Sequence, residues 1–89
     1  MKTITIRIMT PKEIVYNQEV ESIVFPGAVG ETGILPGHAS MVSIVGTGNV
    51  RFRRDNVWHH CAVSGGVLKA DARQVEVYTS SAQVWLAHP

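Results

Sequence analysis

The chain has 89 residues, which allows one domain with a single modest core. Its 13 valines, 7 isoleucines and 6 threonines stand against 3 leucines, and because β-branched side chains crowd a helix, this composition excludes an all-α protein and favours an all-β one. A net charge of +1 excludes a dedicated nucleic-acid binder, and no apolar run is long enough to span a membrane.

Short strands are predicted along the whole chain. Ile4, Ile6 and Ile8 alternate with polar residues and mark a strand with one apolar face, which Pro11 ends because it lacks an N–H donor. In chain order, strands are expected at residues 4–8, 13–16, 20–25, 32–35, 41–45, 49–54, 57–64, 67–70, 74–79 and 83–87. The last segment is equally compatible with a frayed tail, so the pattern predicts nine or ten strands.

Turn residues divide these strands. Residues 17–18 are expected to form a tight turn, residues 46–48 a second turn, and residues 65–66 a bend. The stretch 26–38 holds two of the four prolines and four of the eight glycines, so it is predicted to be the longest irregular region, with repeated positive φ. Strands at this spacing predict one sandwich or barrel domain over residues 1–89, without a helix longer than one turn.

The histidines and the cysteine do not form a metal-binding motif. His59 and His60 are adjacent on a predicted strand and point to opposite faces, while His59 and Cys61 share a face but supply only two ligands. We therefore expect no metal site. A single cysteine cannot form an internal disulfide, which favours a reducing compartment.

Residues for nucleophilic catalysis are present without a motif that unites them. Ser64, His38 and Asp71 could supply a nucleophile, a base and an orienting acid, but no nucleophile-elbow pattern surrounds Ser64. Glu19 and Glu21 share a strand face and are more typical of a solvated surface than of an acid–base pair. We expect no catalytic residue.

Anion and nucleic-acid sites are also not indicated. The glycine-rich stretch 27–33 lacks the residue order of a phosphate-binding loop and any helix that could follow one. The only basic patch consists of Arg51, Arg53 and Arg54, which is typical of a solvated strand face. We therefore expect neither a cofactor nor a nucleic-acid partner.

Two glycine-rich motifs resemble those of a known family. Residues 22–39, SIVFPGAVGETGILPGHA, and residues 63–68, VSGGVL, resemble the two signatures of the ATP synthase epsilon subunit, which is called delta in mitochondria. The opening Ile8-Met9-Thr10-Pro11 also fits, and the resemblance runs from about Ile4 to Thr79.

This resemblance implies both a fold and a function. The implied fold is a ten-stranded β-sandwich of two five-stranded sheets. The implied function is that of a non-catalytic rotor subunit in the central stalk of an F-type ATP synthase, which binds the gamma subunit, sits on the c-subunit ring and couples ion translocation to ATP synthesis. Such a subunit is peripheral to the energy-transducing membrane, on its cytoplasmic face or the organellar equivalent.

The resemblance also assigns residues to the two partners. The loop implied to touch the c ring, with Glu31 as its charged contact, consists of Ala28, Val29, Gly30, Glu31, Thr32 and Gly33. The residues implied to face gamma are Thr10, His38, Ala39, Ser40, Met41 and Val42. Simpler roles stay open, namely a solvated carboxylate for Glu31 and a histidine that satisfies loop backbone groups for His38.

The sequence departs from the family pattern in three places. Ser40 stands where the family usually has proline, and Trp58-His59-His60-Cys61 is unusual for its strand. The common form of the family continues into a two-helix C-terminal domain, whereas this sequence ends at Pro89. We therefore expect no C-terminal helical hairpin here, and none of the ATP binding or rotational inhibition that the hairpin provides.

Two other classes of function remain as alternatives. A small ligand-binding β domain would use the Gly/Pro-rich loop and would need a deep polar pocket near residues 27–37. An enzyme would need Ser64, His38 and Asp71 to lie within hydrogen-bonding distance of one another.

Overall fold

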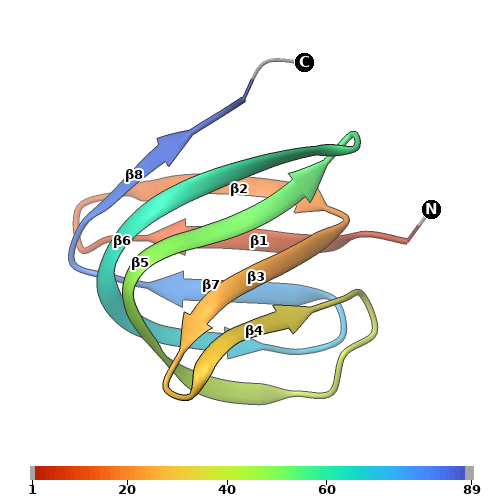
Figure 1. Ribbon diagram of the computed structural model, residues 1–89, viewed down its shortest axis with the longest axis horizontal. Helices are drawn as coiled ribbons and strands as arrows, with labels where there is room; N and C mark the ends of the chain where they lie inside the picture. The colour runs from red at the N-terminus through yellow and green to blue at the C-terminus, as the bar shows by residue number, and fades with distance from the viewer. Residues whose placement is uncertain (1, 88–89) are drawn as a thin grey trace.

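Every regular element that the computed structural model describes, over residues 2–87, is a β-strand (Figure 1). The prediction of an all-β chain is confirmed. Accordingly, residues 2–87 contain no helix that is long and apolar enough to cross a membrane. The strands are β1 (Ile4–Met9), β2 (Ile14–Val20), β3 (Ser22–Gly27), β4 (Gly30–Ile34), β5 (Met41–Arg54), β6 (Val57–Ala70), β7 (Gln74–Tyr78) and β8 (Ala82–Trp85).

All eight strands belong to one hydrogen-bonded sheet. Its order is β2-β1-β7-β6-β5-β3-β4, and β8 pairs with β6 outside this path. Every pairing is antiparallel except that of β1 with β7, which is parallel. The sheet folds over on itself because β5 and β6 curve from one layer into the other (Figure 1).

The two long strands are shared between the layers. Residues 41–45 of β5 and 66–70 of β6 continue the layer of β2, β1 and β7, which we call the first layer. Residues 51–53 of β5 and 60–63 of β6 continue the second layer, which contains β3, β4 and β8. Each layer thus has five strand segments, but the described residues form eight strands in one sheet, not ten strands in two separate sheets.

Glycines account for this difference in strand number. The segments 46–48 and 65–66 were expected to end strands, yet β5 and β6 each run through them for 14 residues. Gly65 and Gly66 have φ values of +89° and +145°, which residues with a Cβ rarely adopt. These two glycines bend β6 sharply and keep it paired with β5 on both sides of the bend.

Two further turns lie elsewhere than predicted. Residues 17–18 are not a turn, because β2 continues through them as an exposed edge strand and the chain turns at Glu21 instead. The stretch 26–38 is more regular than expected, because β3 and β4 form a hairpin with Ala28 and Val29 at its turn. Polar residues on an edge strand and glycines within a hairpin resemble loop signals, which explains both errors.

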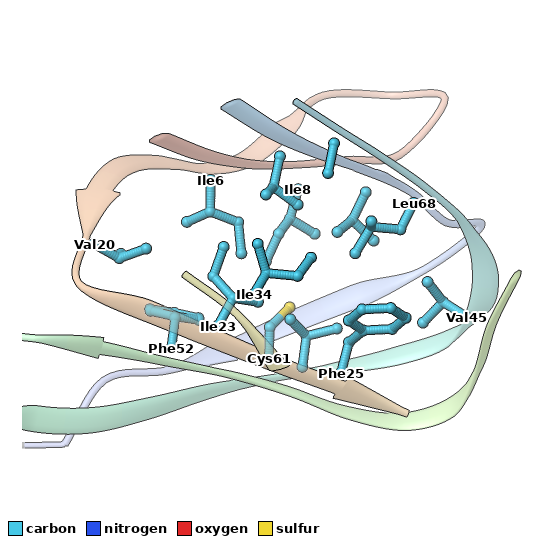
Figure 2. Close-up of a cluster of buried hydrophobic side chains, with 14 of the residues drawn as sticks. Ile6, Ile8, Val20, Ile23, Phe25, Ile34, Val45, Phe52, Cys61 and Leu68 are labelled. Carbon is cyan, nitrogen blue, oxygen red and sulfur yellow. The ribbon is translucent and has the colours of Figure 1, made fainter. Parts of the chain in front are cut away.

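The core lies between the two layers (Figure 2). The predicted alternation in β1 is confirmed, because Ile4, Ile6 and Ile8 are all buried. Phe25 from β3 and Phe52 from β5 are the largest fully buried side chains, and the tilted ring of Tyr16 packs against Phe52 with ring centroids 4.6 Å apart. The core therefore fixes β3 and β5, the strands that carry the surfaces described next.

Candidate partner-binding surfaces

The hairpin of β3 and β4 presents an apolar tip to solvent. Val29 at its turn is fully exposed and Gly30 beside it has a φ of +126°, which turns the chain into β4. Gly27, at the other end of the turn, closes against β4, because a Cβ there would lie 2.9 Å from Thr32 Oγ1 and 3.1 Å from the Gly30 carbonyl oxygen. The tip is thus a narrow projection in which the two strands approach each other closely.

Glu31 on β4 is not an isolated charge. The Arg51 Nη2 group donates to both Glu31 carboxylate oxygens, at 3.0 Å and 2.9 Å, in an ion pair exposed to solvent. The resemblance singles out Glu31 as the charged contact of its loop. Folding pairs this carboxylate with Arg51 of β5, which is 20 residues away along the chain.

The segment between β4 and β5 is organised by backbone hydrogen bonds. The His38 N–H donates to the Leu35 carbonyl oxygen at 3.1 Å, and the Gly37 N–H donates to the Ala72 carbonyl oxygen at 3.0 Å. His38 Nδ1 lies 2.7 Å from the carbonyl oxygen of Ala39. His38 therefore does satisfy a loop backbone group, as the simpler of its two expected roles requires.

Strand alternation divides the residues that follow. Ala39 and Ser40 are exposed, Met41 packs against the core, and Val42 points outward with 72% of its surface accessible. Of the two strand residues expected to contact a partner, only Val42 is free to do so from the outer face of the first layer.

Thr10 lies on a different strand and organises its own turn. Its hydroxyl accepts hydrogen bonds from the backbone N–H groups of Lys12 and Glu13, both at 3.3 Å, in the connection from β1 to β2. Because β6 and β7 lie between β5 and β1, the structure does not place Thr10 beside Val42.

An exposed apolar row crosses the first layer between these two places. Pairing puts five outward-facing residues at one level on five adjacent strands. We call them the apolar row: Ile44 (β5), Val67 (β6), Tyr78 (β7), Met9 (β1) and Ile14 (β2). Ile44 is 62% exposed and Ile14 is 49% exposed, so the row is open to solvent at both ends. Exposed apolar surface of this extent is typical of a protein–protein contact.

The apolar row has a charged row along one side and a groove along the other. The charged row lies two residues away from the apolar row on each of three strands and consists of Lys69, Glu76 and Arg7. Arg7 forms an ion pair of 3.6 Å with Glu76. The groove lies where β6 bends and has a volume of about 610 Å³. It is lined by Met9, Thr10, Pro11, Ser64, Gly65, Gly66, Tyr78, Thr79 and Ser80. Thr10 therefore borders the apolar row beside Met9, whereas Val42 lies beside Ile44 on the opposite side of the row.

Sequence reasoning missed the apolar row. Its members come from five different strands. Within its own strand, each is a single outward-facing apolar residue and gives no signal by itself. The register between strands decides which residues become neighbours, and a single sequence does not specify that register. A usable signal was Val42 with Ile44, because residues two apart on a strand share one face.

The VSGG motif has a structural role in this fold. Ser64 Oγ lies 2.6 Å from Ser80 Oγ and accepts a hydrogen bond of 3.2 Å from the Ser81 N–H, so it fixes the corner between β7 and β8. The Asp71 carboxylate accepts hydrogen bonds from the N–H groups of Arg73 and Gln74 in another turn. Ser64 and Asp71 are thus engaged with different turns, which removes the geometric basis for the enzyme alternative.

The residues considered for metal binding lie in different environments and do not converge on one site. Cys61 is buried in the core, where Figure 2 shows its sulfur among apolar side chains. His59 packs near Phe52 and accepts a hydrogen bond from the Ala87 N–H, while His60 on the outer face stacks on Trp85. Within residues 2–87, no three side chains of the metal-binding types lie close enough to share an ion.

Burial of Cys61 predicts a pH effect on stability. Burial raises the pKa of this thiol to about 11, and a backbone hydrogen bond at Gln83 only partly offsets the increase. Between pH 9 and 11 the unfolded chain releases this proton while the folded chain keeps it, so the free energy of unfolding falls as the pH rises. We expect a loss of about 1–2 kcal/mol over this range, measured by urea denaturation. In the Cys61→Ala variant this contribution should be absent, and identical pH profiles of the two proteins would contradict it.

The loop shows no sign of the ligand pocket that the binding-domain alternative requires. Four cavities lie on the surface of residues 2–87, and none of these four is lined by a residue from 27–37. The glycine-rich segment instead forms a hairpin whose tip projects into solvent.

Comparison with known proteins identifies a matching family. The family model described as "ATP synthase, Delta/Epsilon chain, beta-sandwich domain" matches residues 3–84. The chain is 35% identical over 82 residues to the ATP synthase epsilon chain of Prochloron didemni, covering 92% of this chain and 60% of that protein. It is 36% identical over 81 residues to the epsilon chain of Gloeothece citriformis, covering 91% and 59%. The chain thus spans about 60% of the length of these curated relatives.

Solved structures share the fold at lower identity. A chain in the Euglena gracilis mitochondrial ATP synthase, from a structure of its OSCP, F1 and c-ring parts, has a TM-score of 0.85 and 21% identity, covering 92% of this chain and 53% of that chain. A chain in the Tetrahymena thermophila mitochondrial ATP synthase, from its central stalk and c ring, has a TM-score of 0.75 and 13% identity, covering 92% and 66%. Both are similar to this chain in fold.

Proposed function

Because the chain belongs to the family of the ATP synthase delta/epsilon chain through its β-sandwich domain, we propose that it links the gamma subunit to the c ring of an F-type ATP synthase. In this role it is a structural subunit of the central stalk that couples ion translocation to ATP synthesis, and catalysis belongs to other subunits of the complex. It would lie peripheral to the membrane, held on the cytoplasmic face or its organellar equivalent by the complex.

The apolar row is the observation that carries the gamma contact. Thr10 borders the row beside Met9 and Val42 lies beside Ile44 at the β5 end, so the row joins the two separate places expected to face gamma. His38, Ala39 and Ser40 immediately precede β5, and the last two are exposed. We therefore propose that gamma covers the outer face of the first layer.

The hairpin tip is proposed to contact the c ring. The residues assigned to that contact form the turn and the start of β4, namely Ala28, Val29, Gly30, Glu31, Thr32 and Gly33. The hairpin belongs to the second layer, whereas the apolar row lies on the first, so one molecule can hold both partners at once. The names of the two solved structures, which mention a c ring, are consistent with this arrangement.

A substitution at the tip tests the c-ring contact separately from folding. Val29 is fully exposed, so Val29→Asp should change the free energy of unfolding by no more than about 0.5 kcal/mol. An unpaired charge placed in an interface should nevertheless reduce ATP-driven ion pumping strongly when the chain is reconstituted into ATP synthase depleted of this subunit.

The matched control for Val29 is Gln83→Asp on β8, another exposed position of the second layer. Gamma binding by both variants should equal that of the unmodified chain. Normal pumping by Val29→Asp would place the c-ring contact somewhere other than the tip.

A further inference from the structure

We propose that Arg51 holds the hairpin tip in place by binding Glu31, and so acts as a positioning residue for the c-ring contact. We call this ion pair between Arg51 and Glu31 the strap. Only the consequence for the c ring rests on the proposed function, because the strap itself can be measured in the chain alone.

The tip has limited backbone support. Within residues 2–87, β4 is an edge strand that pairs only with β3, and β3 pairs with β5 only from Ser22 to Val24. Beyond that point β3 contains Pro26, which has no N–H to donate to a neighbouring strand. Pro26 instead packs against the backbone of β5 near Gly46 and Gly48. Residues 26–32 therefore extend past both the last hydrogen-bonded pair that joins the hairpin to the sheet and the buried side chain of Phe25.

Arg51 lies at this last pair. It stands opposite Val24 on β3, and Val24 in turn stands opposite Gly33 on β4. The Arg51 side chain crosses over β3, a distance of roughly 10 Å between the axes of β5 and β4. Its guanidinium then contacts both oxygens of Glu31, two residues nearer the tip than Gly33. The strap thus ties the free edge strand directly to a central strand.

An aromatic side chain packs against the arginine of the strap. The guanidinium carbon of Arg51 lies 5.9 Å from the centre of the Trp58 ring, within the range of a cation–π contact. Arg53 lies 6.0 Å from the same ring and forms a 3.0 Å ion pair with Glu21 at the other end of β3, although its Nε–H is not aligned for a hydrogen bond. These contacts give a role to Trp58, the first residue of the segment that is unusual for its strand, and Arg53 provides a control.

Amide hydrogen exchange of β4 tests the strap in the free chain. Exposed ion pairs contribute little energy, so Arg51→Gln and Glu31→Gln should each make the amides of β4 exchange about two- to fivefold faster. The double variant Glu31→Arg with Arg51→Glu restores the pair with reversed charges and should return exchange to the original rate. In 1 M salt the difference between the original chain and Arg51→Gln should shrink, because salt screens exposed charges.

The control variant is Arg53→Gln. It removes an arginine from the same strand and the same aromatic ring, but leaves the strap intact, so exchange in β4 should not change. Unchanged exchange in Arg51→Gln, or faster exchange that the charge-reversed double variant fails to correct, would overturn the proposal.

Ion pumping tests the positioning role. Arg51 lies back from the tip, so a loss of pumping in Arg51→Gln but not in Arg53→Gln would show that it acts through the hairpin. Faster exchange with normal pumping in Arg51→Gln would overturn that role. Should Val29→Asp pump normally, the c-ring proposal would fail, whereas the exchange rates would still decide whether the strap exists.

Discussion

Replacing Gly66 by alanine is expected to lower the free energy of unfolding by about 3–5 kcal/mol, because two penalties coincide at this position. The φ of Gly66 is +145°, a conformation that costs energy for any residue with a Cβ. The new Cβ would also overlap the carbonyl oxygen of Tyr78 and would lie 3.0 Å from its carbonyl carbon. These atoms belong to backbone in the centre of the first layer and cannot move without disturbing β7.

Thermal denaturation measures this effect directly. For a domain of this size the loss corresponds to a fall in Tm of roughly 15–35 °C. The control is Gly30→Ala, where φ is +126° but no atom lies within 4 Å of the added Cβ, so only backbone strain of about 1–2 kcal/mol applies. If the two variants lose equal stability, the close approach of β6 to β7 is not what requires glycine at position 66.

Placing a carboxylate in the apolar row is expected to reduce the affinity for gamma by about 100-fold, or about 2.7 kcal/mol. Val67 lies near the middle of the row on β6, where Val67→Asp would bury a charge without a partner in the complex. Binding to isolated gamma subunit can be measured by titration calorimetry.

The matched control is Ala62→Asp, an exposed position on β6 that faces outward from the second layer. Both variants place aspartate on the same strand, so any general cost to the strand is shared. Ala62→Asp should bind gamma normally. Loss of affinity in both variants to the same extent would mean that gamma does not recognise the apolar row.

Sequence alone predicted the fold class but not how the strands are joined. Alternation reports which residues of a strand are buried, and Ile4, Ile6 and Ile8 behave as it indicated. Whether a glycine ends a strand or bends it depends on tertiary pairing, which is why the segments 46–48 and 65–66 were misjudged. The two-residue turn at Ala28 and Val29 was not predicted either, because it too depends on the pairing of β3 with β4.

The candidate site was predictable only where its residues are consecutive in sequence. The segments 28–33 and 38–42 could be named as sites from their motifs, and the structure places both at the surface apart from the inward-facing Met41. The apolar row and the strap could not be predicted. Arg51 and Glu31 are far apart along the chain, and their contact depends on the register of β3 with both β4 and β5.

Continuity of β5 and β6 through both layers bears on how torque would travel through the molecule. In a sandwich of two separate sheets, a twisting force passes from one sheet to the other only through side-chain packing, which can slip. Here a load that enters at the hairpin tip and leaves at the apolar row would follow two unbroken lengths of backbone and the hydrogen bonds between them. Yielding would require those hydrogen bonds to break together, so the domain should behave as a stiff connection between the hairpin tip and the apolar row.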